Sequence, residues 1–122
     1  MARLEAQSAV RSALEDALAD ADVRVAVPDP RPAALVVVRR EGGRMLNGLV
    51  DSAGIGIEAF APSEAECASL AMRVSEAMRA LAFSDGFADV SEEACRSDYD
   101  LARGCPRWYL SYTLRTYAPP DK

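Results

Sequence analysis

The sequence predicts an α+β domain, in which two helices pack on one face of a mostly antiparallel sheet of about five to six strands. Three observations carry this prediction. Two stretches repeat apolar residues every three to four positions, as one-sided helices do. Several others alternate them at every second position, as half-buried strands do. Short turn-forming segments separate most of these strands, which favours hairpin connections. We expect residues 1–122 to form a single domain, because this length is near the commonest domain size.

The longest helix signal follows a strand signal at residues 54–61, GIGIEAFA. Ser63 and Glu66 give the S-x-x-E pattern of a capping box, in which hydroxyl and carboxylate satisfy amide groups of the first helical turn. An apolar stripe then recurs at spacings of three and four, formed by Cys67, Leu70, Ala71, Val74, Ala77, Met78 and Leu81. This helix is therefore predicted to be the core helix. Its polar side carries Arg73 and Arg79, which we take as candidate subunit contacts.

The chain before this unit predicts one helix and up to three strands. Residues 3–20 have an amphipathic helix pattern, so we assign residues 1–21 to an N-terminal helix. VRVAV at 23–27 alternates like a half-buried strand, and the β-branched run at 34–40 predicts another. Glycines within 41–43 are expected to form a hairpin turn, after which RMLNGLV returns as a weaker strand.

Residues 51–54 are predicted to form a further reversal before the GIGIEAFA strand. After the core helix, ADVSEEA at 88–94 predicts a short strand with a wet acidic face, and residues 96–106 predict a loop. Residues 117–122 would form a short tail. The last strand shows the clearest alternation, and its expected core face consists of Trp108, Leu110, Tyr112 and Leu114.

Composition excludes several kinds of chemistry. A net charge of −5 disfavours a dedicated DNA-binding surface, which depends on many lysines and arginines. Histidine is absent, which removes Ser-His-Asp and Cys-His pairs and the commonest metal ligand. Gly54 and Gly56 lack the third glycine of a dinucleotide loop. Glu92, Glu93, Asp98 and Asp100 do not have the spacing of an EF-hand loop, so we expect them to lie on a solvated surface and not to form a metal site. With histidine and the cofactor loops missing, no catalytic or cofactor site is expected either.

Two arginine-rich surfaces are the candidate interfaces. Arg39, Arg40 and Arg44 surround the expected glycine turn, where they are either ordinary solvated hairpin charge or a docking site for an acidic partner. The outward side of the last strand carries residue types that are enriched in interface hot spots. The alternative for that side is that the N-terminal helix covers it. The candidate interface residues on that side of the last strand are Arg107, Tyr109, Arg115 and Tyr117.

Several stretches together resemble the tail terminator (tail completion) proteins of long-tailed bacteriophages. They are a proline-rich segment leading to LVVVRREGG, the strand GIGIEAFA, the capped helix SEAECASLAMRVSEAMRAL and the final PRWYLSYTLRTY. The resemblance covers about residues 23–117. It implies a subunit that forms a ring, typically a hexamer, which caps the finished tail tube and offers a surface to the head connector. It places the subunit contacts at the arginine hairpin, residues 39–44, and at the loop 96–106.

The resemblance also implies no enzyme activity. No membrane association is expected either, because residues 1–20 carry acids throughout and have no uninterrupted apolar core. The protein would lie in the neck of the virion after assembly in the host cytoplasm, and DNA would pass its lumen without specific binding. Two alternatives stay open. One is a head-to-tail connector or stopper subunit of the same neck. The other is a small ligand-binding or enzymatic α+β domain, with a pocket between sheet and helices that uses Arg39, Tyr109 or Cys105.

Overall fold

The computed structural model describes residues 5–46 and 48–117. Within these residues the chain forms two α-helices, one short 3-10 helix and five strands. In chain order they are α1 (Ala6–Ala17), β1 (Asp22–Arg24), β2 (Leu35–Met45), β3 (Val50–Phe60), α2 (Glu64–Ala80), η1 (Leu81–Phe83), β4 (Phe87–Ser97) and β5 (Arg107–Tyr117).

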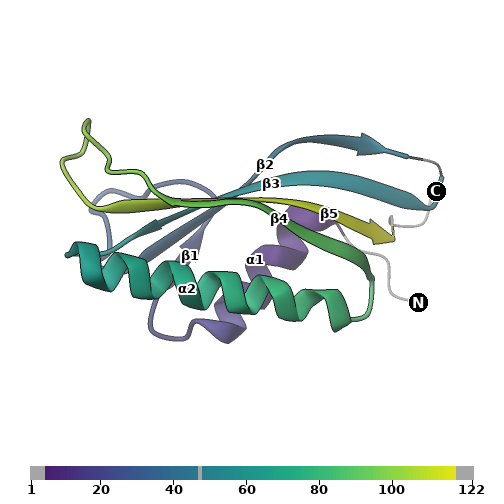
Figure 1. Cartoon of the computed structure of the whole chain (residues 1–122), viewed down its shortest axis with the longest axis horizontal. Helices are drawn as coiled ribbons and strands as arrows, with labels where there is room; N and C mark the ends of the chain where they lie inside the picture. The colour runs from purple at the N-terminus through teal and green to yellow at the C-terminus, as the bar shows by residue number, and fades with distance from the viewer. Residues whose placement is uncertain (1–4, 47, 118–122) are drawn as a thin grey trace.

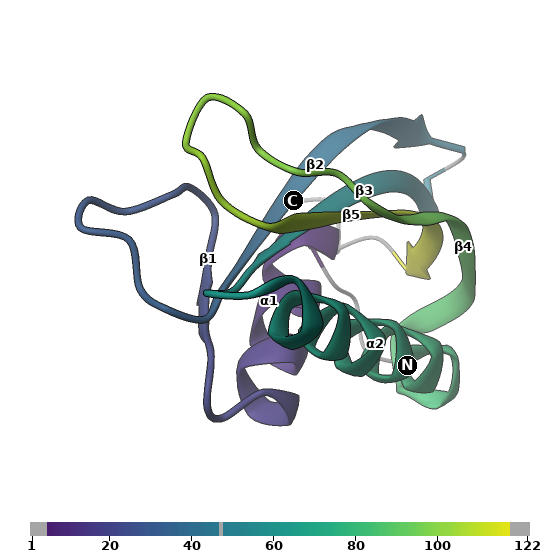
Figure 2. The same cartoon turned by 60° about the vertical axis from the view of Figure 1, so that its left-hand side comes forward.

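The strands form one sheet in the order β1-β2-β3-β5-β4. The short β1 runs parallel to β2, and every other neighbouring pair is antiparallel. Both helices lie on the same face of this sheet, as Figure 1 and Figure 2 show. The predicted α+β class, with two helices on one face of a mostly antiparallel sheet, is confirmed.

The main core lies between the helices and the sheet. Alternate residues of β3 and β5 point toward the helices, because side chains of a strand alternate between its two faces. From α1 the core receives Val10 and Leu14, which are fully buried. The predicted stripe of α2 is confirmed at Leu70, Val74 and Met78, which are all at most 4% exposed. The predicted cap is also present, since the Ser63 hydroxyl accepts the Glu66 N–H at 3.2 Å.

The predicted turn at residues 41–43 is wrong. β2 continues through both glycines, and its pairing with β3 shifts register between Arg40 and Gly42, which marks a β-bulge. Gly43 has a φ of 100°, a left-handed conformation that glycine adopts without strain. The glycines therefore serve a bulge inside a long strand. The reversal comes later, between β2 and β3, so RMLNGLV contains the turn and does not form a strand of its own.

Three other boundaries also need correction. Residues 51–54, predicted as a reversal, belong to β3, where Ala53 already packs in the core. The strand predicted at 23–27 shortens to β1, because the following prolines carry the chain away from the sheet. β4 is longer than predicted, since its pairing with β5 extends to Ser97. The tail residues 118–122 and the first residues of the predicted N-terminal helix lie outside the described residues.

A smaller apolar cluster lies on the other face of the sheet, at the end where β2 begins. It consists of Leu35, Val37, Phe60 and Cys105, with Val27 packed against it. The cluster draws on the loop 98–106, which therefore covers part of the helix-free face. The alternative that the N-terminal helix covers this face is wrong, because α1 packs beside α2 on the opposite side.

Candidate interaction surfaces

Glu58 of β3 is the centre of an ion-pair network on the helix-free face. Its Oε1 accepts Arg39 Nη2 at 2.6 Å, and its Oε2 accepts Arg107 Nη1 at 3.2 Å. Arg107 also donates to the side chain of Asp98 at 3.0 Å and to its backbone oxygen at 2.9 Å. Two of the predicted interface arginines are thus bound within the chain, where they join β2, β3, β5 and the loop 98–106.

Tyr109 is engaged beside this network. Its hydroxyl donates to Glu41 Oε1 at 2.5 Å, and the guanidinium of Arg96 lies 4.9 Å from its ring centroid. The Glu41 carboxylate raises the pKa of Tyr109, since it accepts the phenolic proton. Gly56 makes room for this contact, because a Cβ there would lie only 2.2 Å from the Glu41 carboxyl carbon. Tyr109 therefore links the bulge of β2 to β5.

Asp100 organises the loop 98–106. Its carboxylate accepts the Arg103 backbone N–H at 3.1 Å and the Arg103 guanidinium at 2.6 Å. The hydrogen bond from Arg103 holds the pKa of Asp100 below its ordinary range. Asp100 and Cys105 also exchange backbone hydrogen bonds of 3.0 and 3.2 Å. The predicted loop is confirmed over these residues, and it is held in one shape while Leu101 stays 87% exposed.

Arg40 points to the helix side of the sheet and has a structural role. Its guanidinium donates to both carboxylate oxygens of Asp51, at 2.6 and 2.8 Å. Asp51 is only 7% exposed, so this bidentate pair is partly buried. The backbone N–H of Arg40 donates to the Gln7 side chain of α1 at 2.6 Å. Arg40 thus fixes the hairpin to the N-terminal helix.

The arginines on the polar side of α2 are bound as well. Arg73 forms a bidentate pair with Asp20, with distances of 3.0 and 2.5 Å, and so joins α2 to the segment after α1. Arg79 donates to the Ser75 hydroxyl at 2.8 Å. Their role as subunit contacts stays a prediction, and any partner would have to compete with these internal bonds.

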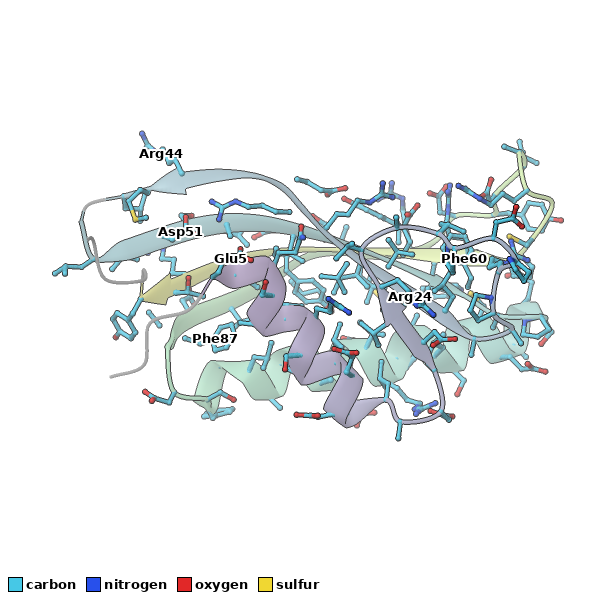
Figure 3. The ribbon with its side chains drawn as sticks, turned by 180° about the vertical axis from the view of Figure 1, so that it is seen from behind. Glu5, Arg24, Arg44, Asp51, Phe60 and Phe87 are labelled. Atoms are coloured by element: carbon cyan, nitrogen blue, oxygen red, sulfur yellow. The ribbon has the colours of Figure 1, made fainter. Side chains whose placement is uncertain are left out.

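Arg44, Arg115 and Tyr117 differ from the other candidates in that their side chains are exposed or partly exposed and form none of the ion pairs described above. Neither Arg44 nor Arg115 makes an ion pair within residues 5–46 and 48–117. Both arginines are exposed, and Figure 3 shows Arg44 pointing away from the sheet near the end of the hairpin. The backbone of Tyr117 donates to Gly86 at 3.0 Å, while its side chain stays partly exposed.

The end of the β2–β3 hairpin forms an exposed apolar patch that the sequence prediction missed. Met45, Leu46 and Leu49 are 51%, 42% and 54% exposed. We call these three residues the hairpin patch. The sequence does contain a signal that could have located this patch. It is the Asn47–Gly48 dipeptide, which lies between apolar residues and is a strong short-range signal for a hairpin.

The predicted pocket between sheet and helices is wrong for all three of its residues. Arg39 and Tyr109 lie on the helix-free face. Cys105 is buried in the smaller cluster, where its Sγ accepts Arg31 Nη1 at 2.8 Å. Hollows elsewhere in the described part of the chain include one of about 220 Å³ that is lined by Asp20, Leu70 and Arg73. Burial raises the pKa of Cys67 on α2 to about 11, as expected for a core thiol.

Residues 5–46 and 48–117 contain no group of three or more cysteine, aspartate or glutamate side chains that could hold a metal ion. In the same residues no helix has the length and apolar character needed to cross a membrane.

The sequence was compared with models of protein families and with curated proteins, and neither comparison finds a match.

Proposed function

We propose that this chain is a structural subunit of the bacteriophage neck, of the tail terminator type. Copies of it form a ring, typically a hexamer, that caps the end of the tail tube and offers its other side to the head connector. It acts in the virion without a cofactor, and DNA passes through the ring. The proposal is supported by the resemblance across residues 23–117 and by one structural observation, the hairpin patch.

The hairpin patch is an unusual feature for a subunit that works alone. Three large apolar side chains gather at the end of one hairpin, and each is at least 42% exposed. Apolar groups gathered in this way mark contacts with other proteins, because burying them removes apolar area from water. The patch lies at one end of the long axis, and the loop 98–106 lies at the other, as Figure 1 shows. A ring subunit that joins two different partners needs distinct surfaces at its two ends.

The test is to mix purified protein with tail tubes that lack a cap and to image the tube ends by negative-stain electron microscopy. We expect a ring at the tube ends with the unaltered chain, and its loss in a variant that combines Leu46→Ser with Leu49→Ser. Met72→Gln is the matched control, because Met72 is 45% exposed on α2, away from the hairpin. It should bind tubes normally.

Each outcome has a defined meaning. Tube ends that stay bare with the unaltered chain contradict the terminator function. Rings that bind isolated head connectors but never tubes would instead support a connector or stopper subunit. A hairpin variant that caps tubes as well as the unaltered chain would show that the patch is not the tube contact. Circular dichroism of each variant checks that the fold is intact.

A further inference from the structure

The sheet has two edges that the described residues leave largely uncovered. β4 is the last strand in the order, and it pairs only with β5. On the other side, β1 covers β2 only at residues 35–37, and the Gln7 side chain occupies the N–H of Arg40. The open stretch of β2 is therefore residues 41–45, at the projecting end of the hairpin (Figure 1). Uncovered edges of this kind are templates for pairing with another chain.

We propose that these two edges bind each other between copies, so that residues 41–45 of one subunit pair with residues 88–92 of the next. This inference rests on the proposed ring, and it identifies the contact that would close it. The partner is a second copy of this chain. The strands form a hydrogen-bonded ladder that continues the sheet from one subunit into the next.

The direction of the strands fits this pairing. β2 is antiparallel to β3, β3 to β5 and β5 to β4, so β4 runs antiparallel to β2 within one subunit. Rotating a copy about an axis parallel to the strands keeps these directions. The β4 edge of one subunit then meets the β2 edge of its neighbour in antiparallel orientation, which a β-ladder accepts.

The two open stretches also lie at the same level of the sheet. Arg44 is directly opposite Ser52, Ser52 is opposite Arg115, and Arg115 is opposite Asp89. Residues that pair across a sheet point to the same face, so all four side chains belong to the helix-free face. In a level arrangement of two subunits, Arg44 of one therefore stands beside Asp89 of the other.

Charge explains why unlike edges would pair in preference to like ones. Arg44 and Asp89 make no ion pair with any other described residue, so each is available to a neighbour. Pairing two β4 edges would bring Asp89 and Glu93 of both copies together, and pairing two β2 edges would do the same for Arg44. Like charges opposite each other in a ladder are destabilising, and opposite charges are stabilising. The favoured contact is head-to-tail, which closes into a ring when its rotation allows.

A charge exchange tests the register of this contact. Arg44→Glu alone and Asp89→Arg alone should each weaken self-association by about tenfold, since each replaces an attraction with a repulsion. The double variant restores the attraction with the signs exchanged and should recover most of the loss. Asp16→Arg, an exposed reversal on α1, is the matched control and should leave association unchanged. Analytical ultracentrifugation measures the association constant, and losses that simply add in the double variant would overturn the proposed register.

Cysteine cross-linking tests the pairing even when the contact is weak. Directly opposite residues of a ladder have Cα atoms about 4.5–5.5 Å apart, within reach of a disulfide. Under oxidation by diamide, a mixture of Arg44→Cys and Asp89→Cys chains should give covalent dimers, and a chain with both substitutions should give a ladder of multimers. The unaltered chain, with Cys67 and Cys105 buried and Cys95 half-buried, is the background control.

The results separate this inference from the proposed function. Dimers from Asp89→Cys alone, at the level of the mixture, would mean that two β4 edges meet and would overturn the inference. The same conclusion follows if neither the mixture nor the double variant cross-links. Cross-linked ladders that never bind tail tubes would support the edge pairing and contradict the terminator function. Tail tubes that are capped by chains that do not cross-link would support the terminator function and contradict the edge pairing.

Discussion

Replacing Tyr112 with phenylalanine tests the polar contact that joins the long helix to the sheet. Tyr112 is 1% exposed, and its hydroxyl donates to Glu92 Oε1 at 2.6 Å. The Ser75 hydroxyl of α2 donates to the same oxygen at 2.7 Å, and Arg79 donates to Ser75 at 2.8 Å. Burial, and then the Glu92 carboxylate, raises the pKa of Tyr112 far above its ordinary range, so the phenol keeps its proton and acts as the donor.

The magnitude follows from the kind of hydrogen bond and from its exposure. A hydrogen bond to a charged group contributes about 1.5–3 kcal/mol to stability. Glu92 lies at the surface, where solvent screens its charge, so we expect a loss at or just below the lower limit of this range, about 1–1.5 kcal/mol, for Tyr112→Phe. The phenylalanine leaves no large cavity. For a domain of this size the loss corresponds to a fall in Tm of roughly 3–8 °C.

Urea unfolding followed by circular dichroism measures this loss. Tyr109→Phe is the control, because it removes a hydroxyl from an exposed hydrogen bond on the helix-free face and should cost less. A double-mutant cycle with Glu92→Gln should show a coupling of at least about 0.5 kcal/mol, as expected for residues in contact. A Tyr112→Phe chain as stable as the unaltered one, or effects that add without coupling, would refute the assigned contact.

The same contact predicts a pH dependence. Burial alone would raise the pKa of Glu92, but hydrogen bonds from Ser75 and Tyr112, with Arg79 nearby, hold it below its ordinary value. A carboxylate with a lowered folded pKa stabilises the fold above its unfolded pKa, and this contribution is lost as the pH falls through the folded pKa. The stability difference between the unaltered chain and Glu92→Gln should therefore shrink as the pH falls below about 4.3. A difference that stays constant in acid would contradict this reasoning.

Three further substitutions test other parts of the fold by urea unfolding. Asp51→Asn should cost about 1–3 kcal/mol, because it leaves a partly buried arginine without its charged partner; an unchanged stability would show that this pair contributes nothing. Gly43→Ala should cost at least about 1 kcal/mol, since its φ of 100° is strained for alanine and a Cβ would lie 2.0 Å from a backbone oxygen of β3, whereas the control Gly42→Ala meets nothing within 4 Å. Ser63→Ala should cost about 1 kcal/mol by removing the cap of α2. The first turn of α2 should then open more often, which faster hydrogen exchange of its backbone amides would show.

The elements with regular periodicity were predictable from the sequence, and the irregular ones were not. Alternation in β5 placed Leu110, Tyr112 and Leu114 in the core, because a strand has only two faces and one is buried here. The glycine pair at 42 and 43 misled the prediction, since a turn and a bulge need the same backbone freedom. The Asn47–Gly48 dipeptide between apolar residues carries the better turn signal, because this pattern is typical of a hairpin reversal.

The candidate surfaces were predictable by residue type but only partly by residue. Arginine clusters in the sequence indicate surfaces that bind acids, and they do not indicate whether those acids belong to the same chain. The partners of Arg39 and Arg40 are Glu58 and Asp51, which come from a neighbouring strand. Only the register of the sheet brings them together, and the misplaced turn gave the wrong register. Arg44 is the member of the predicted hairpin cluster that stays available to a neighbour.

Stability and assembly should therefore depend on different charged residues. Asp51 and Glu92 have their partners inside the subunit, so their replacement should lower Tm without a matching change in self-association. Arg44 and Asp89 lie at the open edges, so their reversal should weaken self-association. Tm should change little for Arg44→Glu and fall only slightly for Asp89→Arg, which places an arginine opposite Arg115 in the same subunit. Measuring both quantities on all four variants decides the point. If the edge variants lost stability in parallel with association, the weakened assembly would reflect damage to the fold. That result would contradict the assignment of the two edges as the subunit contact.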